Sequence, residues 1–391
     1  MPGCAGRTDL NTPAFTRDRQ AGLGYAGFAL YTYAVALLGP AVPFLRAELH
    51  LDYALAGLHA TMFAAGAVAV GAAGERLTAR VGRAGSVRLG ALGTGLALAL
   101  LAAAHSPVLS LLAAAVLGVG ATVLVTTAQT LLADRDAAHQ RTALVEAGIV
   151  SSVSGSAAGW LIGTLQQAGA GWRAALLLPV LAAVALSVWR PGTRPEVAAA
   201  PASGRPSQPL PRAFWRSWGL VFAIVTVEWG LSFWGAAYLT TRGLAPEAAA
   251  RTFSAYLLAL LAGRLLGGVV IRRVRASTPQ VIGAALAVTA AGFTVFWLAP
   301  VSGWRAAGLI VTGLGVANLY PLGLSLALAA APDAQDLAST RITLAVGVAI
   351  LLAPLALGAL ADRLDLQVAY GLVPAALLGA ALLLDRRPPP G

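Results

Sequence analysis

The sequence predicts an all-α polytopic membrane protein whose twelve transmembrane helices form two pseudo-symmetric six-helix bundles. Three observations support this fold class: the composition, a series of twelve apolar runs and an internal repeat. The 391 residues are 58% hydrophobic and 11% charged, and the mean hydropathy is +0.75. Soluble globular proteins carry about 25% charged residues. A chain with so few charges lacks the polar surface that water requires.

The apolar residues fall into runs long enough to cross a bilayer. A helix rises about 1.5 Å per residue, so roughly 20 apolar residues cover a hydrocarbon core of about 30 Å. Helices are required because no backbone polar group can be left unpaired in lipid. The predicted spans are approximately 20–42, 53–73, 84–104, 107–132, 142–166, 172–190, 214–240, 248–271, 277–299, 303–331, 338–362 and 368–385.

Uncommon residues recur at an offset of 195, which indicates that the two halves are duplicates. Gly24 maps to Gly219, Asp52 to Glu247, Gly118 and Gly120 to Gly313 and Gly315, Gly163 to Gly358, and Pro179 to Pro374. We therefore predict an N-terminal bundle over 20–190 and a C-terminal bundle over 214–385. A Pro- and Arg-rich linker over 191–213 joins them, and tails cover 1–19 and 386–391. Two such repeats predict a solute site at their interface, near the middle of the bilayer.

The net charge of +11 comes from 27 Arg and no Lys. These Arg residues lie at loop positions and helix ends rather than on one basic face, so nucleic acid is not an expected partner. With the N-terminus inside, 21 of the 27 fall on the cytoplasmic side, and the exceptions are Arg46, Arg173, Arg242, Arg251, Arg305 and Arg363. Basic residues are retained in the cytoplasm, so we expect an inner-membrane protein with the linker and both termini cytoplasmic.

Several local motifs resemble the major facilitator superfamily, and the resemblance extends from about residue 21 to 384. They are Gly171-Trp172-Arg173-Ala174, Gly313-Leu314-Gly315 with Tyr320-Pro321, and Gly358-Ala359-Leu360-Ala361-Asp362-Arg363. The resemblance implies a secondary transporter. The subfamily stays open: the Arg and the Gly-Pro pair usual in its drug/proton antiporters are missing, and the fucose-permease branch is only faintly similar.

The superfamily also has a gating loop, Gly-x-Leu-Ala-Asp-Arg-x-Gly-Arg, after its second span. Here Leu77, Arg80, Gly82 and Arg83 match that loop, whereas Ala79 replaces its Asp. Glu75 replaces the first Gly and lies four residues before Ala79, hence on the same helical face, where it can supply the missing carboxylate. In the second half, Arg272 occupies the position of the Asp. We expect a gating loop built from Glu75, Arg80, Gly82, Arg83 and Arg272.

Glu228 is the most informative residue, because it lies near the middle of the run 214–240. A carboxylate at the bilayer centre costs a few kcal/mol to insert, which makes it a functional candidate. Desolvation favours the protonated carboxyl group, so Glu228 is the expected proton-coupling residue. The alternative is a structural carboxylate that is hydrogen-bonded to a neighbouring helix.

Other polar residues within the spans are candidates for lining a central cavity. Tyr33 pairs with Glu228 at the offset of 195, and Ser232 follows Glu228 by one helical turn. The remaining candidates are His59, Thr122, Thr126, Gln129, Asn318, Tyr320 and Ser325. The alternative to a cavity role is a structural one: Tyr33 is an aromatic ring packed between helices, and the Thr and Ser hydroxyls are hydrogen-bonded to their own helix.

The expected function is secondary active transport of a small polar solute, a sugar or an organic metabolite, by alternating access with proton coupling. An exporter of amphipathic compounds is the alternative. A chain without Lys cannot form an ATPase phosphate loop, and we find neither metal-ligand spacing nor a catalytic grouping. We expect no cofactor, no metal and no enzymatic activity. The expected partners are the solute, protons and membrane lipids, and we expect a monomer.

Overall fold

The computed structural model describes residues 17–133, 137–189, 209–273 and 276–384, and these are helical almost throughout. Most of the predicted linker, residues 1–16 of the predicted N-terminal tail and the whole predicted C-terminal tail lie outside the described residues. The helices are α1 (Arg19–Ala36), α2 (Leu38–Leu49), α3 (Tyr53–Ala102), α4 (Pro107–Ala133), α5 (Ala137–Gln167), α6 (Ala174–Val188), α7 (Arg212–Thr241), α8 (Pro246–Arg273), α9 (Thr278–Leu298), α10 (Ser302–Val316), α11 (Leu319–Ala329), the 3₁₀ turn η1 (Pro332–Ala334), α12 (Gln335–Arg363), α13 (Leu366–Ala369) and α14 (Leu372–Leu383).

Within the described residues, eleven segments are long and apolar enough to cross a membrane. The twelfth passage is α6, an apolar helix of 15 residues that packs along α3. The helices α1 and α2 together form one passage, as do α10 and α11, whereas α3 contains two. These passages correspond one to one with the twelve predicted runs.

Proline and glycine account for the interruptions. Pro40 has no N–H to donate to Ala36, so α1 ends at Ala36 and α2 starts after Leu37. Pro321 likewise cannot donate to Ala317, and α10 gives way to α11 there. Inside α3 the chain turns at Gly82, whose φ of 68° and ψ of 172° are open to glycine and strained for other residues.

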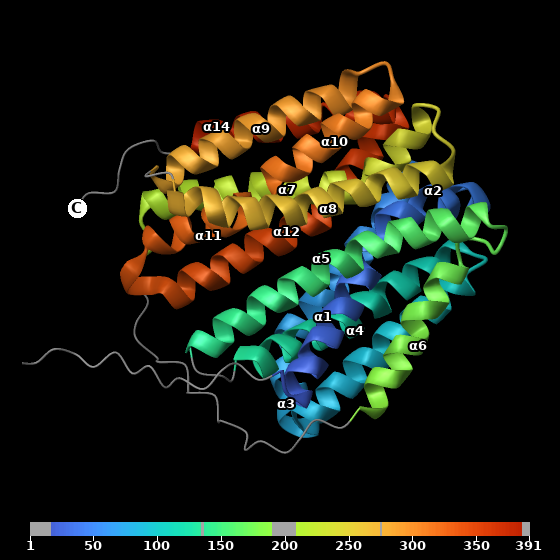
Figure 1. Cartoon of the computed structure of the whole chain (residues 1–391), viewed down its shortest axis with the longest axis horizontal. Coiled ribbons are helices and arrows are strands. Elements are labelled where there is room, and N and C mark those ends of the chain that lie inside the picture. The colour runs from blue at the N-terminus through green and yellow to red at the C-terminus, as the bar shows by residue number, and fades with distance from the viewer. Residues whose placement is uncertain (1–16, 134–136, 190–208, 274–275, 385–391) are drawn as a thin grey trace, which may run out of the picture.

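The passages form two bundles, α1–α6 and α7–α14 (Figure 1). Matched glycines hold each bundle together by letting backbones approach closely. Gly118 of α4 lies against the backbone of Phe63, and Gly313 of α10 against that of Tyr256. Gly120 meets Gly93 and Gly315 meets Thr289 in the same way. Because these pairs are related by about 195 positions, the repeat seen in the sequence is also a repeat in packing.

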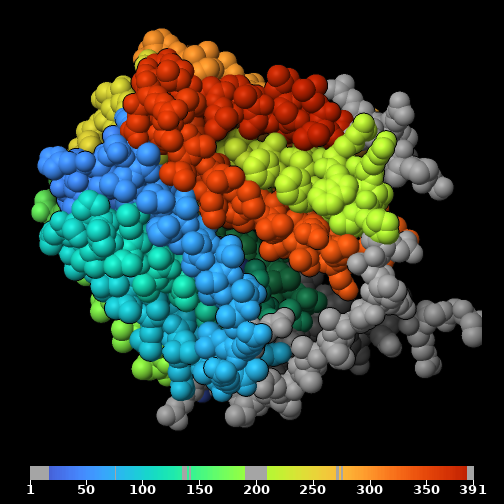
Figure 2. Space-filling view, turned by 180° about the vertical axis from the view of Figure 1, so that it is seen from behind, coloured from blue at the N-terminus to red at the C-terminus, as the bar shows by residue number. Residues whose placement is uncertain are grey.

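The bundles touch at one end and separate at the other. We call the end with the starts of α1 and α7 and the ends of α6 and α14 the terminal face, and the opposite end the loop face. In Figure 1, α5 and α8 lie together near the loop face and diverge toward the terminal face. Figure 2 shows the space between the bundles as a recess beside α12, with α5 at its bottom.

The atoms around the glycines of the interface helices agree with contact between the bundles at the loop face and separation at the terminal face. Near the loop face, Gly163 of α5 lies against the backbone of Glu247 in α8, and Gly358 of α12 lies against the backbone of Tyr53 in α3. Along the same interface helices, α3, α5 and α12, a β-carbon added nearer the terminal face, at Gly71, Gly148 or Gly347, would meet nothing within 4 Å. The structure is therefore closed at the loop face and open at the terminal face.

We expect Gly118→Ala to lower the thermal unfolding temperature of the detergent-purified protein. The new methyl group would overlap the Phe63 backbone, which cannot move aside as a flexible side chain can, and overpacking typically costs about 1–3 kcal/mol. Gly148→Ala is the matched control, because its methyl group enters open space on a helix. Equal unfolding temperatures for the two variants would contradict the packing described here.

Candidate functional site

A cavity of about 320 Å³ lies between the two bundles. Its walls come from α1 and α2, α5, α7 and α8, so both halves of the chain contribute to it. The lining residues are Tyr31, Thr32, Val35, Ala36, Leu38, Gly39, Ser151, Ser152, Gly155, Glu228, Trp229, Ser232, Phe233, Phe253, Leu257, Leu260 and Arg264. A volume near 300 Å³ is at the small end of the range for ligand pockets.

Among the described lining residues, two are charged, Glu228 and Arg264. Glu228 is half-buried and lies thirteen residues, or about 20 Å, from the loop-face end of α7. The charge of Arg264, from α8, lies close enough to act on the Glu228 carboxyl group. The site therefore combines one group that can exchange a proton with one permanent cation.

Hydroxyl groups surround this charged pair. Ser152 donates its hydroxyl to the carbonyl of Gly148, at 2.9 Å, and is thereby satisfied within its own helix. Its neighbour Ser151 has a buried Oγ without a hydrogen-bond partner among the described residues. The buried hydroxyl of Tyr256 lies near Ser232 and Glu228. An unpaired buried hydroxyl is costly, and of these two residues Ser151 lines the cavity, so its hydroxyl is the one placed to bind a ligand.

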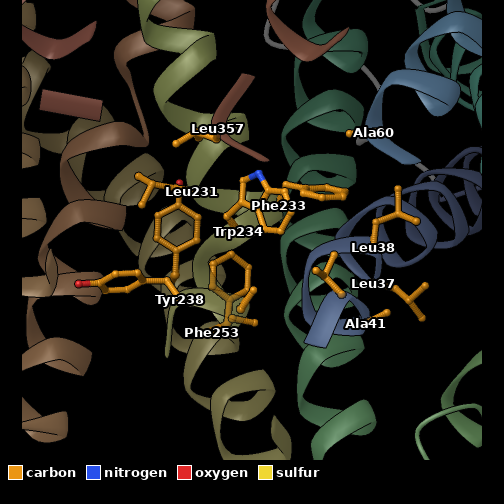
Figure 3. Packing of buried hydrophobic residues seen from close by; sticks show 14 of the residues in the cluster. Leu37, Leu38, Ala41, Ala60, Leu231, Phe233, Trp234, Tyr238, Phe253 and Leu357 are labelled. Carbon is orange, nitrogen blue, oxygen red and sulfur yellow. The ribbon is translucent and has the colours of Figure 1, made fainter. Parts of the chain in front are cut away.

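An apolar layer separates the cavity from the loop face. Figure 3 shows its side chains, including Leu37 and Leu38 from the first passage and Phe233 and Trp234 from α7. The rings of Phe63 and Trp229 stack across the two bundles with centroids 6.0 Å apart. Because the layer continues through both bundles, it excludes water between the cavity and the loop face.

Between this layer and the loop face, hydrogen bonds join the two bundles. The Asp362 carboxylate, at the end of α12, accepts hydrogen bonds from the backbone N–H groups of Tyr53 and Ala54, both at 2.7 Å. Asp362 thus caps the first turn of α3 from the other bundle, where a negative charge is favoured by the helix dipole. The second cross-bundle helix pair, α5 and α8, is joined at the same face by a hydrogen bond from Arg251 to Gln167.

The structure brings together some of the residues predicted to line a cavity and disperses the others. Glu228 and Ser232 line it. Tyr33 does not, because its hydroxyl donates to the Ala175 carbonyl at 2.9 Å, inside the N-terminal bundle. His59 is also buried within that bundle, where Nε2 lies 2.9 Å from Ser110 Oγ. Tyr33 and His59 therefore have the packing and hydrogen bonds of structural residues.

The polar stripes of α4 and α11 lie outside the cavity. Thr126 and Gln129 are exposed, Thr122 is half-buried, and the Thr126 hydroxyl donates to the Thr122 carbonyl of its own helix. Ser325 is exposed on α11. Tyr320 is half-buried and lies within electrostatic reach of Glu228 without lining the cavity.

Asn318 has a structural contact at the break between α10 and α11. Its Nδ2 donates to the Gly263 carbonyl of α8 at 2.7 Å. Because this bond joins two helices of the same bundle, Asn318 holds α8 against the break instead of reaching the cavity.

The predicted gating loop lies at the terminal face, where the bundles are apart. Gly82 makes the turn inside α3, Arg80 is exposed and Arg83 is half-buried with an interaction partner. The side chains of Glu75 and Arg272 lie outside the described part of the structure. The gating role of these five residues stays a prediction.

Sequence reasoning did not assign Arg264, Tyr31 or Ser151 to the cavity, and it favoured a snorkelling or loop-paired role for Arg264 near the end of its span. Arg264 carried a usable signal, since an arginine inside a spanning run is as costly as the glutamate that drew attention to Glu228. Tyr31 was missed because the offset of 195 is not uniform. The α1 lining residues Tyr31, Thr32, Val35 and Ala36 match the α7 residues Glu228, Trp229, Ser232 and Phe233 at an offset of 197. Two residues turn a helix by about 200°, which is why Tyr33 points away.

Comparison with known proteins identifies the class of this fold. A family model described as Major Facilitator Superfamily matches residues 24–306. The chain belongs to the major facilitator superfamily, and it is a multi-pass membrane transporter rather than an enzyme. The predicted fold class is thereby confirmed. No curated protein sequence matches the chain.

Solved structures share the fold at low sequence identity. A bacterial homolog of the human lysosomal transporter Spinster, inward-facing and unoccupied, superimposes with a TM-score of 0.69 and 16% identity, covering 94% of this chain and 93% of that one. The POT family transporter PepTSo gives 0.69 and 13%, covering 93% and 97%. A mutant of the nucleoside transporter NupG gives 0.74 and 12%, covering 94% and 99%.

We expect Asp362→Asn to weaken closure at the loop face, because the neutral amide replaces a charge that caps α3. A loss of about 1 kcal/mol would raise the population of molecules open at this face roughly fivefold. The measurement is the labelling rate of a cysteine at Ser232, in a Cys4→Ser background, by a thiol reagent applied from the loop face.

Asp365→Asn is the control for this experiment. Asp365 accepts a bond from the Val368 N–H at 2.7 Å in the same region, but it caps α13 within one bundle. Faster labelling in both variants, or in neither, would argue against a specific cross-bundle role for Asp362.

Proposed function

We propose that the protein is a secondary active transporter that moves a small polar solute, a sugar or another organic metabolite, across the cytoplasmic membrane by alternating access coupled to protons. The observation that supports it is the cavity between the bundles, which contains Glu228 and Arg264. A carboxyl group beside a cation, in a space that one face can reach, can bind and release a proton as the surroundings change.

In the proposed cycle the loop face, closed in this structure, opens, and the terminal face, open in this structure, closes. In this structure the loop face is closed by the glycine contacts, the Asp362 cap and the apolar layer. Rocking of one bundle against the other would part these contacts and close the terminal face, which is the common form of alternating access in such folds. Before that change, with the terminal face open, the exposed polar stripe of α4 would line the route between the terminal face and the cavity.

The proposed orientation places the terminal face in the cytoplasm. The excess of Arg in the linker, the tails and the terminal-face ends of the helices supports it, since basic residues are retained on that side. With this orientation the structure corresponds to an inward-facing state. We also propose that the transporter is a monomer whose other partners are protons and lipids.

Export of amphipathic compounds is the second candidate function. Much of the cavity wall is apolar, with Phe253, Leu257 and Leu260 from α8 facing Leu38 and Phe233. Such a wall favours solutes with a hydrocarbon or aromatic part. In proteoliposomes, proton symport predicts solute accumulation when the interior is alkaline, whereas proton-driven export by exchange predicts accumulation when the interior is acidic.

We expect Glu228→Gln to abolish accumulation driven by a pH gradient while leaving solute exchange at equal concentrations intact. One proton per solute gives up to about tenfold accumulation per pH unit, and a glutamine cannot supply it. Uptake and counterflow in proteoliposomes are the two measurements. Glu247→Gln, which changes a carboxylate in the first turn of α8 outside the cavity, is the control. If the Glu228 variant responds to the gradient as the unmodified protein does, proton coupling through this residue is wrong.

A further inference from the structure

We infer that the transported solute is a small organic monoanion with an apolar body, bound by Arg264, and that it crosses together with one proton on Glu228 in an electroneutral cycle. This inference rests on the proposed function and specifies its substrate class. The basis is the pair of charged residues in the cavity, Glu228 and Arg264, which the sequence did not show to be neighbours.

The charge balance of the cavity allows one anion and one proton. With Glu228 ionised, the carboxylate and the Arg264 guanidinium cancel, and the empty cavity is neutral. Protonation of Glu228 leaves one positive charge, which a monoanion neutralises. Moving a net charge through a low-dielectric region is expensive. Both the empty and the loaded cavity avoid that cost, whereas a neutral solute with a proton would leave Arg264 uncompensated.

Arg264 is available to an anion. Its side chain is exposed on the α8 wall, and no described carboxylate lies within ion-pair distance of it. The described ion pairs, Arg17 with Glu146 and Arg173 with Glu48, lie elsewhere. A guanidinium presents parallel N–H donors that match the two oxygens of a carboxylate. Ser151, whose Oγ has no hydrogen-bond partner in the part of the chain that the structure describes, supplies a further donor from the opposite bundle.

Glu228 is the group in the cavity that titrates. The groups that face it are Arg264 and Tyr256 from α8, Tyr320 from α11 and Tyr31 from α1. Arginine stays protonated, and tyrosine hydroxyls keep their protons near neutral pH. The carboxyl group is therefore the member of this set that can change charge, and its protonation removes the negative charge that competes with the solute for Arg264.

The apolar part of the cavity wall and the cavity volume determine the size and polarity of the uncharged part of the solute. Leu257, Leu260, Phe253, Trp229 and Phe233 present apolar surface, and the whole cavity is about 320 Å³. A molecule of this description has one anionic group at the Arg264 end and a short hydrocarbon or aromatic body against the rings. Phenylacetate has these properties, and phenylacetamide has the same shape without the charge.

The first test is binding of this matched pair of probes to the purified full-length protein, by thermal shift and calorimetry. We expect phenylacetate to bind at least about tenfold more tightly than phenylacetamide, because charge-assisted hydrogen bonds are stronger than neutral ones. Arg264→Gln should remove the preference and Arg264→Lys should keep part of it, which separates loss of charge from misfolding. Arg273→Gln, near the end of the same helix and outside the cavity, is the control.

The pH dependence of binding assigns the role of Glu228. Phenylacetate affinity should rise as pH falls in the unmodified protein, because the competing carboxylate becomes neutral. In Glu228→Gln the affinity should be high and independent of pH. A Glu228→Gln protein with unchanged pH dependence would overturn the competition between Glu228 and the anion.

The second test is electroneutrality in proteoliposomes containing labelled phenylacetate. Uptake in excess of that into protein-free liposomes, which measures diffusion of the protonated acid, should follow an imposed pH gradient and ignore a membrane potential set by potassium and valinomycin. Movement of one net charge would instead change accumulation roughly 50-fold per 100 mV. A dependence of that size would overturn the electroneutral cycle.

The outcomes separate this inference from the proposed function. Equal binding of acid and amide, or no binding of any monocarboxylate from acetate to phenylacetate, would overturn the anion inference while gradient-driven transport of a neutral solute still stood. Conversely, tight and Arg264-dependent anion binding without accumulation under any gradient would overturn secondary active transport while supporting an anion site. Binding with the expected preference and electroneutral uptake would support both.

Discussion

Close approach of helix backbones at glycine, across the line where the two bundles meet, is the constraint on which the rest of the structure depends. At Gly163 and Gly358 the backbones of the two bundles approach without an intervening side chain, and both contacts lie toward the loop face. Association of helices in lipid relies on this kind of packing, since lipid tails are as apolar as leucine. In this structure these contacts lie toward the loop face while the bundles are apart at the terminal face, and the cavity lies between these two regions.

The same arrangement explains how two charged side chains are tolerated deep in an apolar chain. Glu228 and Arg264 project into the space between the bundles instead of into lipid. Arg264 is exposed to that space, and Glu228 is half-buried at its side. Each therefore lies where water, a proton or a solute can compensate it, as intramembrane charges require. The apolar layer below them keeps that compensation from becoming a continuous leak.

Much of the fold was predictable from the sequence, and the site was predictable in part. Hydropathy predicted twelve passages, and glycine, proline and acidic residues predicted the duplication. Glu228 and Ser232 were assigned to an inter-bundle cavity that they do line, although their roles remain proposals. Tyr33, Asn318 and His59 were assigned with them, yet each makes its contacts inside one bundle. A repeat offset that differs by two residues between helices is enough to turn a side chain to the opposite face.

The sequence by itself determined that the chain is a duplicated set of membrane-spanning helices, because backbone groups in lipid must be paired and charges there are rare. It did not determine where the helices break, since the chain is interrupted at Pro40 and Pro321 while Pro43, Pro179 and Pro354 lie within continuous helices. Only the tertiary structure decided which residues share the cavity, that Arg264 is the neighbour of Glu228, and which face is closed. Those facts depend on helix rotation and on contacts between segments as far apart as Tyr53 and Asp362, which local sequence patterns do not specify.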